Sequence, residues 1–224
     1  MALTVYSWGA YATYNHKEIP FRDEDSQVYV MVKVAKGELA TRQYQNVKAL
    51  DGRTYLVSKA NPQGAFDVFG QYGAHVLSAQ KNALIVPVPS SGHIQLGQPF
   101  TGARLVDAIV RRMPKDAGVS AAPILAFKRV MPRASKGEAN ARDKALIKAA
   151  LTTSVKSLSG PVLLVDDVCT SGAHLMACAE FLRDLGADVR TAVCIGRTSS
   201  TQHPTPLAVP PEDIEAQFSL FFGH

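Results

Sequence analysis

The distribution of hydrophobic and polar positions changes near residue 80. Before that point, short runs rich in β-branched and aromatic residues predict strands at 3–8 and 27–34. Asp51-Gly52 joins two further runs, 46–50 and 53–58, and predicts a hairpin because this dipeptide tolerates the positive φ of a tight turn. After Asn61-Pro62, apolar residues recur at helical spacing and predict a helix with one buried face.

From residue 84 onward, apolar strands alternate with amphipathic helices. Strands are predicted at 84–88, 123–127, 162–165 and 189–195, and helices at 101–112, 142–151 and 173–185. This alternation is typical of a parallel sheet that is covered by helices on both faces. The sequence therefore predicts an α/β fold with a Rossmann-like parallel sheet flanked by helices.

Aromatic residues are unevenly distributed along the chain. All seven tyrosines and the single tryptophan lie within the first 72 residues, and the chain becomes rich in Ser, Thr and Pro after Arg197. We therefore predict a small β-rich N-terminal hood over residues 1–64, an α/β core over 65–198 and a C-terminal tail over 199–224. The apolar part of this tail, 214–222, is expected to dock on the core.

The composition excludes several classes of protein. Hydrophobic residues make up 46% of the chain, but no apolar run approaches the ~20 residues of a membrane helix. The N-terminus has no basic stretch before an apolar run, so it does not resemble a signal peptide. None of the three cysteines stands in a C-x-x-C pair, which argues against a disulfide scaffold and a structural zinc site. We expect a cytoplasmic protein with no membrane partner.

One segment carries the net charge of +5. Residues 128–148 contain seven basic and two acidic side chains, whereas the rest of the chain has 17 of each. A neutral body with one basic segment indicates a local site for a polyanion rather than a surface that coats DNA. A solvated helix face is the simpler interpretation, so the charge alone does not decide the function.

The most informative stretch is 162–174, in which an apolar strand ends in Asp166 and Asp167 and a small polar loop then begins a helix. A Thr-Ser-Gly-Ala turn at a helix N-terminus favours a phosphate, and Gly172 allows the backbone to approach it closely. The two carboxylates can accept hydrogen bonds from a sugar diol and can stay ionised beside a divalent cation. Together these features outline a site for ribose 5-phosphate.

Two other interpretations of this stretch explain less of it. Receiver domains also use a pair of aspartates for Mg²⁺, but they need a phosphoacceptor Asp on a later strand. Only 57 residues follow Asp167, and no strand-ending Asp occurs among them. A purely structural turn would use Thr and Ser as helix caps, but it would not call for two carboxylates at the strand end.

Residues 165–173, Val-Asp-Asp-Val-Cys-Thr-Ser-Gly-Ala, resemble the signature with which type I phosphoribosyltransferases bind 5-phosphoribosyl 1-diphosphate (PRPP). Residues 84–91 resemble the first strand and pyrophosphate loop of the ComF-like subgroup, and the basic segment falls where the family has its mobile catalytic loop. The resemblance covers about 65–197 and implies the type I phosphoribosyltransferase core. It also implies that PRPP binds with Mg²⁺ and that its ribose phosphate passes to a nitrogenous base with release of pyrophosphate.

The resemblance gives each matching residue a role. Asp166 and Asp167 would be catalytic and would hold the ribose hydroxyls and Mg²⁺, directly or through the metal's water shell. Arg133 and Lys136 would be catalytic residues of the loop that closes over the leaving group. The remaining PRPP contacts would be Ser90, Ser91 and Gly92 for the pyrophosphate, Lys128, Arg129 and Arg142 from the basic segment, and Thr170, Ser171, Gly172, Ala173 and His174 for the 5′-phosphate.

Two positions depart from the family pattern. His174 stands where Thr or Ser is usual, and its imidazole could donate to phosphate or face solvent. Thr170 stands where members that use 6-oxopurines carry an Asp, which counts against hypoxanthine or guanine as the acceptor. The N-terminal region also lacks the cysteines of the zinc finger that ComF-like proteins often carry.

These residues are compatible with three functions. The first is a phosphoribosyltransferase whose partners are PRPP and a small nitrogenous acceptor. The resemblance also makes a homodimer possible, because many family members are dimers. The second is a non-catalytic module that senses PRPP or a nucleotide. The third is a ComF-like accessory protein in DNA uptake or processing, for which nucleic acid is the less favoured partner. The basic segment favours the enzyme, because a sensor has less need to stabilise departing pyrophosphate.

Overall fold

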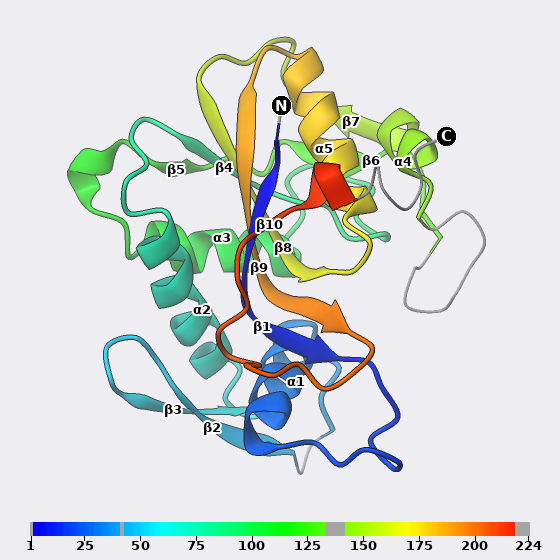
Figure 1. Ribbon diagram of the computed structural model, residues 1–224. Coiled ribbons are helices and arrows are strands. Elements are labelled where there is room, and N and C mark those ends of the chain that lie inside the picture. The colour runs from blue at the N-terminus through cyan, green and yellow to red at the C-terminus, as the bar shows by residue number, and fades with distance from the viewer. Residues whose placement is uncertain (1, 41–42, 133–141, 218–224) are drawn as a thin grey trace.

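One six-stranded sheet forms the centre of the part that the computed structural model describes, residues 2–40, 43–132 and 142–217 (Figure 1). Its strand order is β10-β1-β9-β8-β4-β5. The strands are β1 (Thr4–Ala12), β4 (Leu84–Pro87), β5 (Ser120–Ala121), β8 (Pro161–Cys169), β9 (Asp188–Ser199) and β10 (Glu212–Asp213). Neighbours from β1 to β5 run parallel, and the short β10 pairs antiparallel with β1 at the edge.

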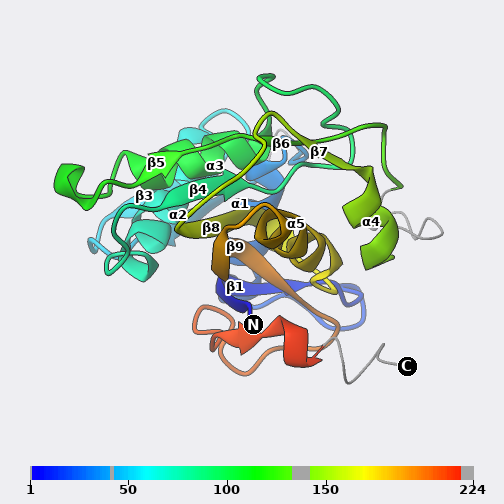
Figure 2. The same ribbon diagram turned by 90° about the horizontal axis from the view of Figure 1, so that it is seen from above.

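Helices cover both faces of the sheet, as the view from above shows (Figure 2). α1 (Asp23–Ala35), α2 (Gln63–Val76) and α3 (Thr101–Val110) pack on one face, and α4 (Lys144–Ala150) and α5 (Ala173–Asp184) lie on the other. Side chains of a strand alternate between the two faces. Leu163 and Val165 of β8 therefore belong to the first apolar cluster, and Val162 and Leu164 belong to the second. These observations confirm the predicted α/β fold.

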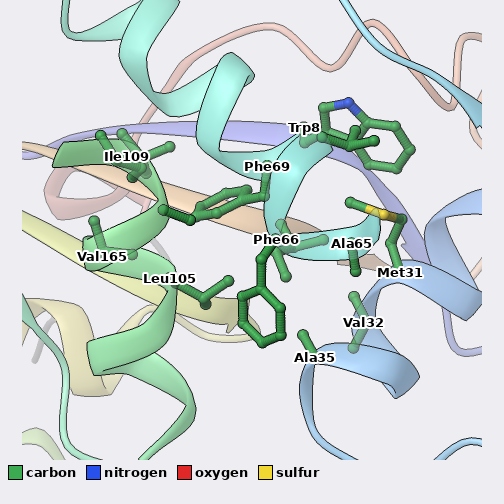
Figure 3. Close-up of a cluster of buried hydrophobic side chains, with 14 of the residues drawn as sticks. Trp8, Met31, Val32, Ala35, Ala65, Phe66, Phe69, Leu105, Ile109 and Val165 are labelled. Atoms are coloured by element: carbon green, nitrogen blue, oxygen red, sulfur yellow. The ribbon is translucent and has the colours of Figure 1, made fainter. Parts of the chain in front are cut away.

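The apolar cluster beneath α1, α2 and α3 holds these helices against the sheet (Figure 3). Phe69 of α2, Leu105 and Ile109 of α3 and Val165 of β8 are fully buried there. Complete burial of an apolar side chain of this size contributes ~1.5–3 kcal/mol. The cluster therefore fixes where the end of β8 lies relative to the helices around it.

Two antiparallel pairs of strands lie outside the main sheet. The first joins β2 (Tyr44–Lys48) to β3 (Thr54–Ser58) and confirms the hairpin predicted around Asp51-Gly52. The second joins β6 (Leu125–Phe127) to β7 (Leu151–Thr153), so the predicted strand at 123–127 exists but does not enter the main sheet. A short 3₁₀ helix, η1 (Lys115–Ala117), precedes β5.

The strand predicted at 27–34 is wrong, because these residues belong to α1. The valines of this segment suggested β structure, but Val28, Met31 and Val32 follow helical spacing and are buried on the sheet. The first turn of α1 is acidic, which is favourable at a helix N-terminus. Packing of one helical face therefore outweighs the intrinsic preference of valine for strands.

The strand predicted at 3–8 is confirmed as part of β1, but it lies inside the main sheet, between β9 and β10. The boundaries proposed at residues 64 and 198 stay predictions. Ile214, at the start of the apolar part of the tail, is buried, and its N–H donates to the carbonyl of Leu3 at 3.1 Å. Residues 218–222 of that part lie outside the described residues. None of the helices within the described ranges has the length and apolar character to cross a membrane.

Candidate functional site

A cavity of about 960 Å³ opens beyond the carboxyl ends of the parallel strands. Tyr11 and Thr13 line it from the end of β1, the loop after β4 lines it with Ser90 and Ser91, and Thr198 lines it from β9. The end of β8 and the turn that follows complete the wall. Ligands of open parallel sheets bind at this edge, and we call this space the strand-end cavity.

Most of the residues predicted from the sequence meet in the strand-end cavity. The predicted residues that line it are Ser90, Ser91, Gly92, Arg142, Asp166, Asp167, Thr170, Ser171 and His174. They come from β8 with the turn after it and from two segments that are distant in the sequence, 90–92 and Arg142, so the fold brings together what the motifs suggested separately.

The remaining predicted residues are placed differently. Gly172 and Ala173 are buried in the turn and do not line the cavity with side chains. Among the described residues, Lys128 and Arg129 also lie outside the cavity lining, and the ammonium of Lys128 donates to the carbonyl of Ala149 at 2.9 Å. Arg133 and Lys136 lie outside the described residues.

The turn between β8 and α5 has the shape expected of a phosphate cradle. Gly172 is the N-cap of α5 with φ of +80°, which is the left-handed region, and it makes no side-chain capping hydrogen bond. The positive end of the α5 dipole therefore points toward the turn that carries Thr170 and Ser171. Arg197 of β9 holds this turn by donating to the carbonyl of Thr170, and its own guanidinium is paired with Glu212 at 2.9 Å. Arg197 was not predicted, because its contact depends on the pairing of β8 with β9.

The two aspartates lie within the last residues of β8 rather than after it, because the strand extends to Cys169. The N–H of Asp167 donates to Oδ1 of Asp166 at 2.8 Å, and Nζ of Lys36 lies 3.2 Å from Oδ1 of Asp167. Burial raises the pKa of Asp166 well above its usual range, and the charge of Asp167 adds to this effect. Burial also raises the pKa of Asp167, although Lys36 acts in the opposite direction. Full ionisation of the pair therefore needs a cation nearby.

The donor set of this pair suits Mg²⁺ better than a tightly caged metal. Within the described residues, no group of three or more His, Cys, Asp or Glu side chains could hold a metal ion. Two carboxylates leave most positions of a divalent cation to water or to ligand phosphates, which is the arrangement that Mg²⁺ adopts with phosphate substrates. Asp166 and Asp167 fit such a cation.

The loop after β4 is anchored to the strand that leads into the basic segment. The N–H of His93 donates to the carbonyl of Ser90 at 2.8 Å, and the carbonyl of His93 accepts from Phe127 of β6 at 2.9 Å. The imidazole of His93 is buried against the ring of Phe100, with ring centroids 4.0 Å apart. Burial lowers the pKa of His93, so this ring is neutral at pH 7. Ser90 is exposed at the tip of the loop, where it can meet a ligand.

His174 lines the strand-end cavity, and donation from its imidazole to a phosphate stays a prediction. Its ring makes an edge contact with Phe127 at 6.1 Å between centroids. Burial lowers the pKa of His174, so its imidazole is neutral at pH 7.

Several cavity residues come from the N-terminal part of the chain and were not predicted. Lys33, Lys36 and Glu38 reach the cavity from the end of α1, and Tyr11 reaches it from β1. Lys33 is paired with Glu38 at 2.9 Å. Lys36-Gly37 is typical of the end of a helix and could have indicated this group. The segment before it was predicted as a strand at 27–34, so no helix end was expected there.

Comparisons with known proteins give distant structural neighbours. No protein-family model matches the chain, and no curated protein matches it either. It is similar to UMP synthase from Leishmania donovani, with 17% identity and a TM-score of 0.39 over 80% of this chain and 33% of that one. It is also similar to orotate phosphoribosyltransferases from Mycobacterium tuberculosis (16% identity, TM-score 0.39, 84% of this chain and 91% of that one) and Aeropyrum pernix (18%, 0.34, 75% and 81%).

This chain therefore spans about a third of the UMP synthase chain that it matches. The likeness is distant, so what the strand-end cavity can bind is inferred from its own residues.

Proposed function

We propose that this protein is a phosphoribosyltransferase that binds PRPP together with Mg²⁺ and transfers ribose 5-phosphate to a small nitrogenous acceptor with release of pyrophosphate. The observation that supports this proposal is the convergence of three features on one cavity: the turn after β8, the aspartate pair and the loop after β4. These features match the 5′-phosphate, the ribose diol and the diphosphate of PRPP. The cavity volume of about 960 Å³ lies at the upper end of the ~300–1,000 Å³ typical of small-molecule sites.

The phosphate end of the substrate belongs at the turn after β8. Thr170 and Ser171 line the cavity there, and the α5 dipole favours an anion. Arg197 keeps the turn in place from behind without lining the cavity. His174 adds a neutral ring N–H as a donor to phosphate.

Departure of pyrophosphate is the step that needs charge stabilisation. Ser90, Ser91 and Arg142 line the cavity where the diphosphate would lie, and Arg133 and Lys136 are proposed to join them from the basic segment. When bound, Mg²⁺ would neutralise negative charge on the leaving group. Asp166 and Asp167 accept hydrogen bonds from the ribose hydroxyls and favour the positive charge that develops on the ribose ring.

The acceptor would stack on an aromatic ring of the cavity wall. Tyr11 lines the cavity from the end of β1 and Phe100 lines it from the residue before α3, and a planar base can stack on such a ring. Thr170 provides no carboxylate for a 6-oxopurine, so a base other than hypoxanthine or guanine is preferred.

A nucleic-acid ligand is less well supported, because part of the basic segment is neutralised within the protein. Lys144 of α4 lies 2.6 Å from Glu180, and Lys148 lies 2.8 Å from Asp184, with both carboxylates on α5. These ion pairs lower the positive charge that α4 can offer to a polyanion.

The experiment that tests the proposal measures pyrophosphate released from PRPP and Mg²⁺ in the presence of single bases, including orotate, nicotinate, uracil, adenine and hypoxanthine. We expect release with at least one base that is not a 6-oxopurine and none from Asp167→Asn. PRPP binding without release for any base would favour the sensing module instead. Absence of both binding and release would contradict the proposal.

A further inference from the structure

The backbone of Lys36, a residue that lines the strand-end cavity, is held in place by hydrogen bonds. It is the C-cap of α1, and its N–H donates to the carbonyl of Val32 at 3.0 Å. Gly37 follows with φ of +71°, and the N–H of Glu38 returns to the carbonyl of Lys33 at 2.8 Å. These bonds hold the end of α1, so the Lys36 side chain starts from a defined position.

The side chain of Lys36 crosses from α1 to the end of β8. Its ammonium lies 3.2 Å from Oδ1 of Asp167, and 29% of the Lys36 side chain and 22% of the Asp167 side chain are exposed. Among the described residues, no other ion pair involves Asp166 or Asp167. Within the described ranges, Lys36 is therefore the cation that pairs with the two aspartates.

The same carboxylate is the one that a divalent cation would use. An ammonium and a hydrated metal ion repel each other, so each weakens the binding of the other to Asp167. A ligand that brings four or five negative charges changes this balance, because it attracts the metal and the ammonium together.

We propose that Lys36 is a positioning residue that neutralises and orients Asp167 in the ligand-free protein and makes way for a divalent cation only when that cation arrives with a sugar diphosphate. The displaced ammonium stays within the cavity and turns to the anionic oxygens of the ligand. Lys36 thereby disfavours binding of the free metal and favours binding of the metal with its diphosphate. This inference rests on the proposed function, because it assumes a ligand that carries both metal and phosphate.

The test compares binding of Mn²⁺ alone, followed by electron paramagnetic resonance of the free ion, in the full-length wild type and in Lys36→Met. Methionine keeps the length of the side chain and removes its charge. We expect Lys36→Met to bind Mn²⁺ about tenfold more tightly than the wild type, because the competing cation is gone. A second titration, with PRPP at saturating Mn²⁺, should show about tenfold weaker PRPP binding in the variant, because one ligand contact is lost.

Two further variants separate this role from a general effect of charge or folding. Lys33→Met removes the same charge one turn earlier on α1, where the partner is Glu38 rather than an aspartate, and should change Mn²⁺ binding less than about threefold. Lys36→Arg keeps the charge and should bind Mn²⁺ as weakly as the wild type. Lys36→Gln replaces Lys36→Met if the methionine variant does not fold.

Unchanged or weaker Mn²⁺ binding by the uncharged Lys36 variant would overturn the proposal, as would PRPP binding that the substitution leaves unaffected. These outcomes differ from failure of the proposed function, in which the wild type itself would not bind PRPP at any Mn²⁺ concentration.

Discussion

Replacing Gly172 by alanine tests how the turn between β8 and α5 is held. Gly172 has φ of +80°, and this left-handed conformation costs an alanine roughly 1–2 kcal/mol. The added methyl would also lie 3.1 Å from Cδ1 of Ile214, which is buried beneath the turn. Overpacking of this kind adds ~1 kcal/mol when the neighbour can shift. We therefore expect Gly172→Ala to lower the free energy of unfolding by ~2–3 kcal/mol.

The matched control is Gly160→Ala. Gly160 has φ of +79°, but a methyl there would meet no atom within 4 Å, so only the conformational cost of ~1–2 kcal/mol remains. Urea denaturation of the wild type and both variants measures the two costs, and their difference isolates the contact with Ile214. Equal losses in both variants would show that the contact with Ile214 is unimportant. No loss in either would refute the strain argument itself.

Three other predictions follow from the site. Asp167→Asn should weaken PRPP binding at least about tenfold in calorimetry. It should change the free energy of unfolding by less than ~1 kcal/mol, because the lost ion pair with Lys36 and the relieved repulsion between the aspartates offset each other. Equal loss of binding and folding would make this residue structural. Burial lowers the pKa of His93, so the unfolded chain binds a proton more readily, and the free energy of unfolding falls as the pH decreases below ~6.5. Between pH 7.5 and 5.5, urea denaturation should show a larger loss of this free energy for the wild type than for His93→Phe, by at most ~1.4 kcal/mol per pH unit. Parallel losses in the two proteins would contradict this prediction. The double substitution Arg133→Ala with Lys136→Ala should lower pyrophosphate release while largely sparing PRPP affinity, and unchanged turnover would remove both side chains from the mechanism.

Local signals were sufficient where a single short segment determines the structure. Asp51-Gly52 predicted a hairpin, and Gly52 adopts φ of +81° there. The turn at 170–173 before a helix was predicted for a similar reason, because glycine and small hydroxyl residues favour a tight turn at a helix N-terminus. The local sequence was sufficient to predict both turns, although Arg197 of the distant β9 also holds the second one.

Contacts between distant segments could not be predicted from such signals. The place of β1 beside β9 depends on which strand of the sheet has a free edge, and the sequence of β1 does not encode its partner. Lys36 contacts Asp167 only because α1, which follows β1 in the chain, ends close to the end of β8. The valines of α1 favoured a strand in isolation, and the helix is stabilised by its burial on the sheet.

Calorimetric titration with PRPP, with and without Mg²⁺, tests the central claim most directly, with ribose 5-phosphate as the reference ligand. The strand-end cavity predicts Mg²⁺-dependent binding of PRPP that is at least about tenfold tighter than that of ribose 5-phosphate, because only PRPP carries the diphosphate for the loop after β4. Equal affinity for the two ligands would remove the diphosphate subsite. Absence of binding by either would contradict a ribose-phosphate site altogether.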